Sequence, residues 1–355
     1  MANKVLVGIS GGVDSSVSAA ILKDKGFEVT GAFMKNWEDD DGTPYCSVKE
    51  DFFDAARVCD KLGIELIQLN FAKEYKEKVF EYFLNSLKNG KTPNPDIFCN
   101  KFIKFDAFFD YAIKNNFDQI ATGHYCQIEQ KDSSYLLKKS YDQSKDQTYF
   151  LNDIKIEVLN KCLFPIGDIE KSQVREIAKS KGLVTFDKKD STGICFIGER
   201  PFPEFLSNYL PVRKGNIYDE NQNLIGEHNG VYFYTLGQRQ GLGIGGIKGS
   251  QEQPWYVAAK DNQKNSLTVV QDNNHPLLLK SELTVKKINW LVETIPNLKD
   301  ITAKIRYRQK EQTCSLRETA NGWSVEFDVP QRAITPGQSV VFYSGDICLG
   351  GGEIE

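Results

Sequence analysis

The stretch Ser10-Gly11-Gly12-Val13-Asp14-Ser15-Ser16 decides the fold of this chain. The apolar run Lys4–Ile9 before it predicts a buried strand, and Ser15–Lys25, followed by Gly26, predicts a helix. Two glycines between a strand and a helix let the backbone approach an anion, which the free N–H groups and dipole of the helix start favour. The Walker and G-x-G-x-x-G patterns are both absent. The stretch therefore predicts a phosphate loop of another kind, with an ordinary capped glycine turn as the alternative.

Strand-like and helix-like stretches alternate through the first half of the chain. Strands are predicted at Phe27–Met34, Glu65–Leu69 and Gln119–Ala121, and helices at Asp51–Leu62, Phe105–Asn115, Ile154–Cys162 and Lys171–Lys181. Strands that alternate with helices of about ten residues indicate βαβ units and a parallel sheet. We therefore predict an α/β domain over residues 1–210.

The pattern changes after about residue 210. Short β-rich runs are separated by Gly, Pro and Asn, at Gly230–Thr235, Trp255–Ala259, Ser266–Val270, Thr302–Tyr307, Trp323–Phe327 and Ser339–Tyr343. This texture is typical of small β-barrels or sandwiches. We predict a central β-rich domain over 211–275 and a barrel-like domain over 276–355.

The composition sets wide limits on function. The 355 residues carry 44 Lys and Arg against 48 Asp and Glu, a net charge of −4, which by itself disfavours a nucleic-acid partner. Strand periodicity would nevertheless place Lys304, Arg306, Arg308 and Lys310 on one face, as a phosphate-facing stripe or an ordinary solvated face. No apolar run reaches the ~18 residues of a membrane span, and no signal-peptide core is present. We expect a cytoplasmic protein whose eight cysteines are mostly thiols, either buried or reactive.

Two cysteine-containing segments have settings that suit chemistry. In Thr92–Asn100, the carboxylate Asp96 precedes Cys99 by three residues. Asp96 can act as a base or orient a nucleobase, and Cys99 can attack as a thiolate. In Asp190–Gly198, Cys195 stands between two glycines. Taken alone, a cysteine in a loop is more often inert, and nothing local couples Cys99 with Cys195.

These segments together resemble one family, the tRNA-specific 2-thiouridylases of the MnmA type, within the ATP pyrophosphatase (PP-loop) superfamily. The resemblance covers essentially the whole chain. It rests on the joint occurrence, in order, of Gly8–Ser15, Met34–Trp37, Thr92–Asn100, Ala121–Tyr125, Lys145–Leu151, Pro165–Gly167, Ser191–Ile197, Thr235–Gly243, Ile305–Gln309, Thr335–Gln338 and Cys348–Gly352.

The resemblance implies a role for particular residues. The ATP phosphate loop would be Gly8, Ile9, Ser10, Gly11, Gly12, Val13, Asp14 and Ser15, with Met34 and Gly123 as further ATP contacts. Asn94, Pro95 and Asp96 match the segment that contacts the target uridine, Cys99 the nucleophile and Cys195 the persulfide carrier. The matches to tRNA contacts are His124, Lys145, Asp146, Gln147, Arg306, Tyr307 and Gln338.

The implied reaction is ATP-dependent thiolation of the wobble uridine of tRNA. ATP, with Mg²⁺ bound to it, adenylates the uracil O2, and sulfur from the Cys195 persulfide replaces that oxygen. The persulfide could attack directly, or Cys99 could release hydrosulfide from it; both routes end in a Cys99–Cys195 disulfide. The implied partners are tRNA and a cysteine desulfurase or sulfur-relay protein. No metal site of the protein itself is expected. The alternatives are another ATP pyrophosphatase that acts on a small metabolite, and a non-catalytic tRNA-binding protein.

Overall fold

The N-terminal domain is built on a five-stranded parallel sheet. The computed structural model describes residues 2–38, 48–189, 201–244, 253–295, 297–298 and 301–355. The sheet order is β3-β2-β1-β4-β7, with β1 at Lys4–Gly8, β2 at Glu28–Lys35, β3 at Glu65–Asn70, β4 at Gln119–Ala121 and β7 at Cys162–Leu163. The predicted parallel sheet is confirmed, and its central strand leads into the phosphate loop.

Helices cover both faces of this sheet. On one face, Val5 and Val7 pack in the same core as α1 (Val13–Asp24), α2 (Val48–Leu62) and α7 (Lys171–Ser180). On the other face, Leu6 belongs to a second core that includes α6 (Phe108–Lys114). Alternate residues of β1 therefore belong to opposite cores, which explains the unbroken apolar run of this strand.

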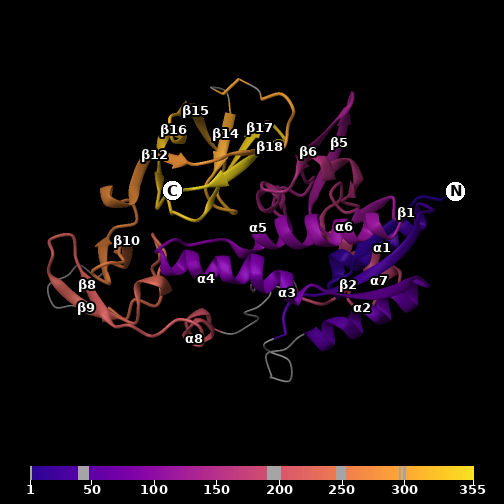
Figure 1. Cartoon of the computed structure of the whole chain (residues 1–355), viewed down its shortest axis with the longest axis horizontal. Coiled ribbons are helices and arrows are strands. Elements are labelled where there is room, and N and C mark those ends of the chain that lie inside the picture. The colour runs from indigo at the N-terminus through magenta and orange to yellow at the C-terminus, as the bar shows by residue number, and fades with distance from the viewer. Residues whose placement is uncertain (1, 39–47, 190–200, 245–252, 296, 299–300) are drawn as a thin grey trace.

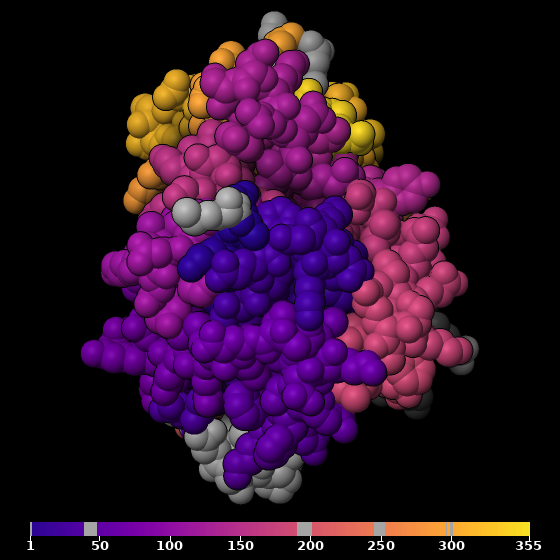
Figure 2. Space-filling view, turned by 90° about the vertical axis from the view of Figure 1, so that its right-hand side faces the viewer, coloured from indigo at the N-terminus to yellow at the C-terminus, as the bar shows by residue number. Residues whose placement is uncertain are grey.

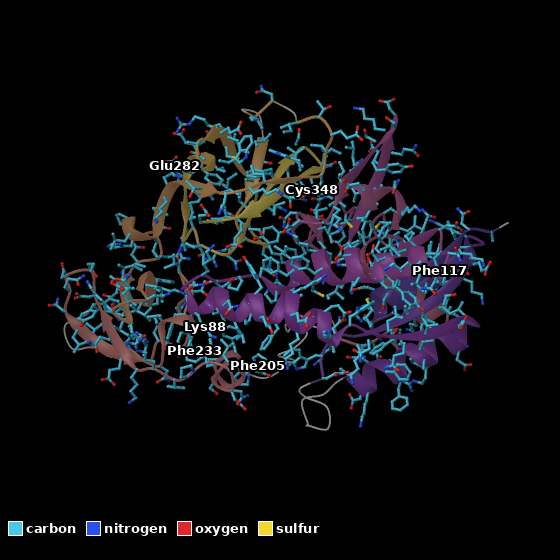
Figure 3. All side chains as sticks on the ribbon, viewed as in Figure 1. Lys88, Phe117, Phe205, Phe233, Glu282 and Cys348 are labelled. Atoms are coloured by element: carbon cyan, nitrogen blue, oxygen red, sulfur yellow. The ribbon has the colours of Figure 1, made fainter. Side chains whose placement is uncertain are left out.

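Two long helical stretches lead from the sheet toward the rest of the molecule (Figure 1). One comprises α3 (Ala72–Tyr75), the π-helical η1 (Lys76–Phe80) and α4 (Glu81–Lys88); the other comprises α5 (Pro95–Cys99), the π-helical η2 (Asn100–Ala107) and α6. Figure 3 labels Lys88, at the end of α4, and Phe233 of the central domain. The Lys88 carbonyl accepts a hydrogen bond from Asn262 Nδ2 at 3.4 Å. The helical pair thus bridges the two domains.

The central domain contains a four-stranded sheet of order β10-β11-β8-β9. Its strands are β8 (Gly215–Tyr218), β9 (Leu224–His228), β10 (Trp255–Asp261) and β11 (Ser266–Gln271), and α8 (Phe202–Ser207) precedes them. The strand predicted at Gly230–Thr235 is wrong, because Val231–Phe233 forms a 3₁₀ turn, η5. Gly230 has φ +142° there, and the Val231 and Phe233 side chains fill the core without an extended backbone. Their β propensity reflects burial here, not strand formation.

The C-terminal domain is the barrel-like sheet that the sequence predicts. Its path is β12-β16-β15-β14-β17-β18-β6-β5, and β13 pairs with β18. The strands are β12 (Leu279–Val285), β13 (Asn289–Trp290), β14 (Ile301–Lys304), β15 (Gln312–Thr319), β16 (Gly322–Arg332), β17 (Ser339–Ser344) and β18 (Ile347–Glu353). The domain limits 211–275 and 276–355 stay predictions.

A hairpin from the N-terminal half extends this C-terminal sheet. Strands β5 (Cys126–Lys131) and β6 (Ser134–Lys139) pair with each other, and Lys138 of β6 lies opposite Ile347 of β18. Figure 2 shows the magenta hairpin region against the yellow and orange barrel, above the indigo N-terminal domain. No local signal in the sequence predicts this hairpin, although it joins the two domains.

Two further predictions are wrong. The predicted helix Ile154–Cys162 is a 3₁₀ turn, η4 (Ile156–Lys161), followed by β7, because Cys162 pairs with Ile120 of β4. The predicted strand Thr302–Tyr307 ends at Lys304, and residues 305–309 form a turn. Its four cations consequently do not share a strand face. Within the described residues, no helix combines the length and hydropathy that crossing a membrane requires.

Candidate functional site

The phosphate loop lies where β1 ends and α1 begins. Its shape depends on serines of the following helix: Ser15 Oγ accepts from Ser10 N at 3.1 Å and donates to Gly12 O at 3.1 Å, and Ser16 Oγ also donates to Gly12 O, at 2.8 Å. Gly11 has φ +76°, and a Cβ there would collide with the Asp51 carbonyl. The serine hydrogen bonds and the glycine conformation therefore fix the shape of the loop, and the free amide groups at the start of α1 lie beside it.

The other predicted ATP residues lie beside this loop. A Cβ on Gly123 would be 2.7 Å from Ser15 N, so this residue must be glycine for the chain after β4 to pass the start of α1. Met34 of β2 brings its Cε to 3.1 Å from the position of a Cβ on Gly8. The carboxyl ends of β1, β2 and β4 thus meet at the point where the strand order reverses, which is where open parallel sheets bind ligands. This glycine-lined cradle fits a nucleotide phosphate chain.

Asp14 of the loop has partners that the sequence analysis does not identify. Lys171 Nζ, from α7, lies 2.7 and 2.8 Å from its two carboxylate oxygens, and Tyr125 OH donates to it at 2.8 Å. An unpaired carboxylate in the first turn of α1 would repel a phosphate. The ion pair with Lys171 neutralises it. No local signal could link two residues that are 157 positions apart.

The predicted target-base segment begins helix α5. Asn94 is its N-cap and accepts from Asp96 N at 3.1 Å, and Pro95 occupies the first turn. Asp96 and Cys99 are three residues apart on this helix and thus share a face, with Asp96 half-buried and Cys99 buried. Burial raises the pKa of the Asp96 carboxyl, and the charge of Lys104 opposes that rise. A raised pKa makes this carboxylate a stronger base than an ordinary aspartate, which suits a group that accepts a proton in a reaction.

His124 connects the helix with the phosphate loop. It follows Gly123, it is buried, and its Nδ1 lies 2.7 Å from Thr122 Oγ1. Its ring centroid is 5.8 Å from that of Phe105, which belongs to η2. Burial first, and the charge of Lys104 second, hold the pKa of His124 well below its usual value. The imidazole is therefore neutral at physiological pH.

Two predicted tRNA contacts have their side chains engaged within the protein. The buried Asp146 accepts from Thr148 Oγ1 at 2.8 Å and from Ser140 N at 3.2 Å, and burial raises its pKa. Gln147 Oε1 accepts from Tyr125 N at 2.9 Å. These bonds give the segment around Lys145 a fixed shape. A cavity of about 480 Å³ lies beside it, lined by Gln143, Ser144, Asp146, Lys304, Tyr307, Arg308, Gln309, Lys310 and Glu311.

Arg306 and Gln338 join domains. The Arg306 guanidinium donates to Leu236 O and Ala333 O, both at 3.0 Å, and to Thr335 Oγ1 at 2.9 Å. Gln338 Nε2 donates to Thr92 O at 2.6 Å. Both residues thus hold segments of other domains against the barrel, a role that the resemblance does not imply.

Apart from Cys46, which lies outside the described residues, and Cys99 on α5, the cysteines fall into two groups. Cys195, with its segment Asp190–Gly198, lies outside the described residues. Burial raises the pKa of Cys59 to about 11 and the pKa values of Cys314 and Cys348 to about 12, and it raises those of Cys126 and Cys162 further. These five thiols are suited to packing, because the thiolate is the reactive form.

The fold and the site define an HUP-type nucleotide-binding protein with two β domains attached. Models for three families match the chain: the tRNA methyl transferase HUP domain over residues 3–199, the tRNA methyl transferase PRC-barrel domain over 203–271 and the aminomethyltransferase beta-barrel domain over 280–354. No group of three or more His, Cys, Asp or Glu in the described part of the chain could hold a metal ion.

Full-length relatives specify the family further. A tRNA-specific 2-thiouridylase MnmA of Francisella tularensis subsp. tularensis (strain WY96-3418) is 58% identical over 99% of both chains. The tRNA-specific 2-thiouridylase MnmA of Stutzerimonas stutzeri (strain A1501) is 55% identical, and the match covers 99% of this chain and 94% of that protein. The chain belongs to the tRNA-specific 2-thiouridylase family. A 4-thiouridine synthetase in complex with RNA and ATP is 16% identical, with a TM-score of 0.36 over 58% of this chain and 49% of that one.

Proposed function

We propose that this protein is an ATP-dependent tRNA sulfurtransferase that converts the wobble uridine of tRNA to 2-thiouridine. The observation that carries the proposal is the meeting of the phosphate loop with helix α5. Gly123 contacts the start of α1, and the next residue, His124, packs on the η2 segment that continues α5. A nucleotide at the loop and a uracil beside Asp96 would then occupy one site.

ATP is a substrate in this proposal. Gly8–Ser15 holds its phosphates, and Met34 and Gly123 lie beside them. Mg²⁺ would enter with the nucleotide and offset its charge. The uracil O2 bonds to the α-phosphorus while the bond from that phosphorus to the bridging oxygen breaks, and pyrophosphate leaves with the electron pair. Asp96 accepts the N3 proton, a role that its raised pKa supports.

Sulfur would come from a persulfide on Cys195, loaded by a cysteine desulfurase or a sulfur-relay protein. In the direct route, the terminal sulfur attacks C2, AMP leaves with the former O2, and the Cys99 thiolate then displaces the thiolated base from Cys195. In the alternative route, Cys99 first displaces hydrosulfide, which attacks C2. Either route leaves a Cys99–Cys195 disulfide, which needs a two-electron reductant before the next turnover.

The barrel and the turn at residues 305–309 would bind the tRNA, in the cytoplasm. Arg308 and Lys310 are exposed beside the 480 Å³ cavity. They supply local positive charge that the net charge of −4 conceals. Lys145, Tyr307 and the other contacts implied by the resemblance complete the proposed interface.

Mass analysis of nucleosides tests the proposal. Uridine-containing tRNA is incubated with the protein, ATP, Mg²⁺ and a persulfide donor, and one oxygen-to-sulfur exchange is expected. Cys195→Ser is expected to abolish the exchange. An ATP pyrophosphatase for a small metabolite would lack the exchange, and a non-catalytic RNA-binding protein would release no AMP.

A further inference from the structure

Tyr125 lies between the phosphate loop and the segment 142–147, which contains three of the tRNA contacts that the resemblance implies. Its side chain is buried, and its hydroxyl donates a hydrogen bond to Asp14 of the loop at 2.8 Å. Its backbone is bonded to Gln147 in both directions. Tyr125 N donates to Gln147 Oε1 at 2.9 Å, and Gln147 N donates to Tyr125 O at 2.8 Å. One residue is therefore bonded to both proposed substrate sites.

Lys171 gives the same two sites a second connection. Its Nζ forms the ion pair with Asp14, and its backbone N donates to Asp142 Oδ2 at 3.2 Å. The Nζ also lies 5.6 Å from the centroid of the Tyr125 ring. The two connections share Asp14 at one end and the segment 142–147 at the other, so they form a closed ring of contacts. A displacement of either end is therefore transmitted to the other.

The segment 142–147 is held in shape by its own hydrogen bonds. Asp142 Oδ1 accepts from Ser144 N at 3.1 Å and from Ser144 Oγ at 2.6 Å. Lys145 N donates to Asp142 O at 3.0 Å. An RNA phosphate that binds Lys145 would thus meet an ordered turn, and this turn is bonded to Tyr125.

We propose that Tyr125 is a positioning residue that couples the binding of tRNA at the segment 142–147 with the binding of ATP at the phosphate loop. This inference rests on the proposed function. Both ligands need the same arrangement of the ring of contacts. The ligand that binds first fixes that arrangement, so the second ligand binds more tightly. Charge alone predicts the opposite sign, because the phosphates of RNA and of ATP repel each other.

Equilibrium binding tests the coupling without turnover. The probe is adenosine 5′-(α,β-methylene)triphosphate, whose methylene bridge cannot be cleaved, and its Kd is measured in Mg²⁺ with and without saturating tRNA. Coupling between two sites typically changes affinity by about 5–150-fold, and we expect tRNA to lower this Kd by roughly tenfold. The nucleotide is expected to lower the Kd of tRNA by the same factor, since linkage is reciprocal.

Two tyrosine variants locate the coupling. Tyr125→Phe removes only the hydroxyl that contacts Asp14, and Asp14 keeps its ion pair with Lys171. In this variant the gain in affinity is expected to fall to about twofold or less. Tyr149→Phe is the matched control, because Tyr149 is also buried and its hydroxyl donates to Ser339 O of the barrel at 2.8 Å. The control is expected to keep the full gain.

The ratio of the two nucleotide Kd values separates coupling from a purely structural role, which would change the affinity for each ligand alone. Equal Kd values with and without tRNA in the unaltered protein would overturn the inference. A gain that survives in Tyr125→Phe would also overturn it, since the uracil and the nucleotide would then contact each other directly. So would an equal loss of the gain in Tyr149→Phe. Failure of the unaltered protein to bind either ligand would instead refute the proposed function.

Discussion

Replacement of Arg306 by Met tests whether this residue clamps domains together or contacts RNA. Its guanidinium makes three hydrogen bonds, to Leu236 O, Ala333 O and Thr335 Oγ1. Ala333 O keeps another donor, Thr335 Oγ1 at 2.7 Å, so the principal acceptor left without its partner is Leu236 O. Met has a similar length and preserves most of the packing, which isolates the loss of the bonds.

The expected destabilisation follows from this count. Hydrogen bonds to charged groups contribute about 1.5–3 kcal/mol each, and an abandoned buried acceptor costs about 1–3 kcal/mol. Burial lowers the pKa of Arg306, which indicates that its desolvation offsets part of the gain. We therefore expect a net loss of about 2 kcal/mol. With a urea dependence of about 2 kcal/mol per molar, the midpoint should fall by roughly 1 M.

The assay is urea unfolding followed by tryptophan fluorescence, since three of the four tryptophans, Trp255, Trp290 and Trp323, lie in the central and barrel domains. Arg306→Lys serves as the control. Lysine keeps the positive charge of Arg306 but can donate to fewer of its three acceptors. Binding of tRNA is measured in parallel at several salt concentrations. If the Arg306→Met midpoint is unchanged while the salt dependence of binding falls by about one counterion, Arg306 contacts RNA and the clamp is wrong.

Three further predictions concern the site. Gly11→Ala places a Cβ against Asp51 O at φ +76°, and equilibrium ATP binding should be lost while the far-ultraviolet circular dichroism stays unchanged. Asp96→Asn removes the proposed base, so AMP release should fall by about 10²–10⁴-fold with ATP affinity retained. In the unaltered protein, this rate should fall as the pH drops through the pKa of Asp96, which burial raises above its usual value. Lys171→Met leaves Asp14 charged beside the phosphate site, and calorimetry should detect at least tenfold weaker ATP binding.

The sequence predicts the N-terminal sheet well because its signals are local. The apolar run of β1, the glycine loop and the start of α1 are adjacent in the chain, and each one specifies its own conformation. The failures involve distant contacts. Cys162–Leu163 forms a strand because it pairs with the edge of β4. Val231–Phe233 is not extended, because its turn buries the side chains of Val231 and Phe233. Propensity carries no information about such partners.

The same distinction applies to the site. The resemblance proposes roles for residues inside one motif, such as Asn94, Asp96 and Cys99, and the structure places these three on one helix, α5, with Asn94 as its N-cap. The supposed cationic stripe illustrates the opposite case. Lys304 Nζ forms ion pairs with Asp146 and Glu311, each at 3.8 Å, and Arg306 donates hydrogen bonds to backbone carbonyls. Alternation in sequence indicates a shared face only where the chain stays extended.

The arrangement of the domains would link the proposed RNA binding to the proposed chemistry through the segment before α5. Thr92 N donates to Pro336 O at 2.8 Å, and Gln338 donates back to Thr92 O, so the barrel holds the chain two residues before Asn94. The β5–β6 hairpin gives the same barrel a second attachment, directly after the segment that contains Gly123 and His124. Adenylation requires the uracil and the α-phosphate to be aligned to within about an ångström. In the proposed function, a tRNA held on the barrel would be positioned relative to both reacting groups by these two attachments, because each one bonds the barrel to a segment of the proposed site.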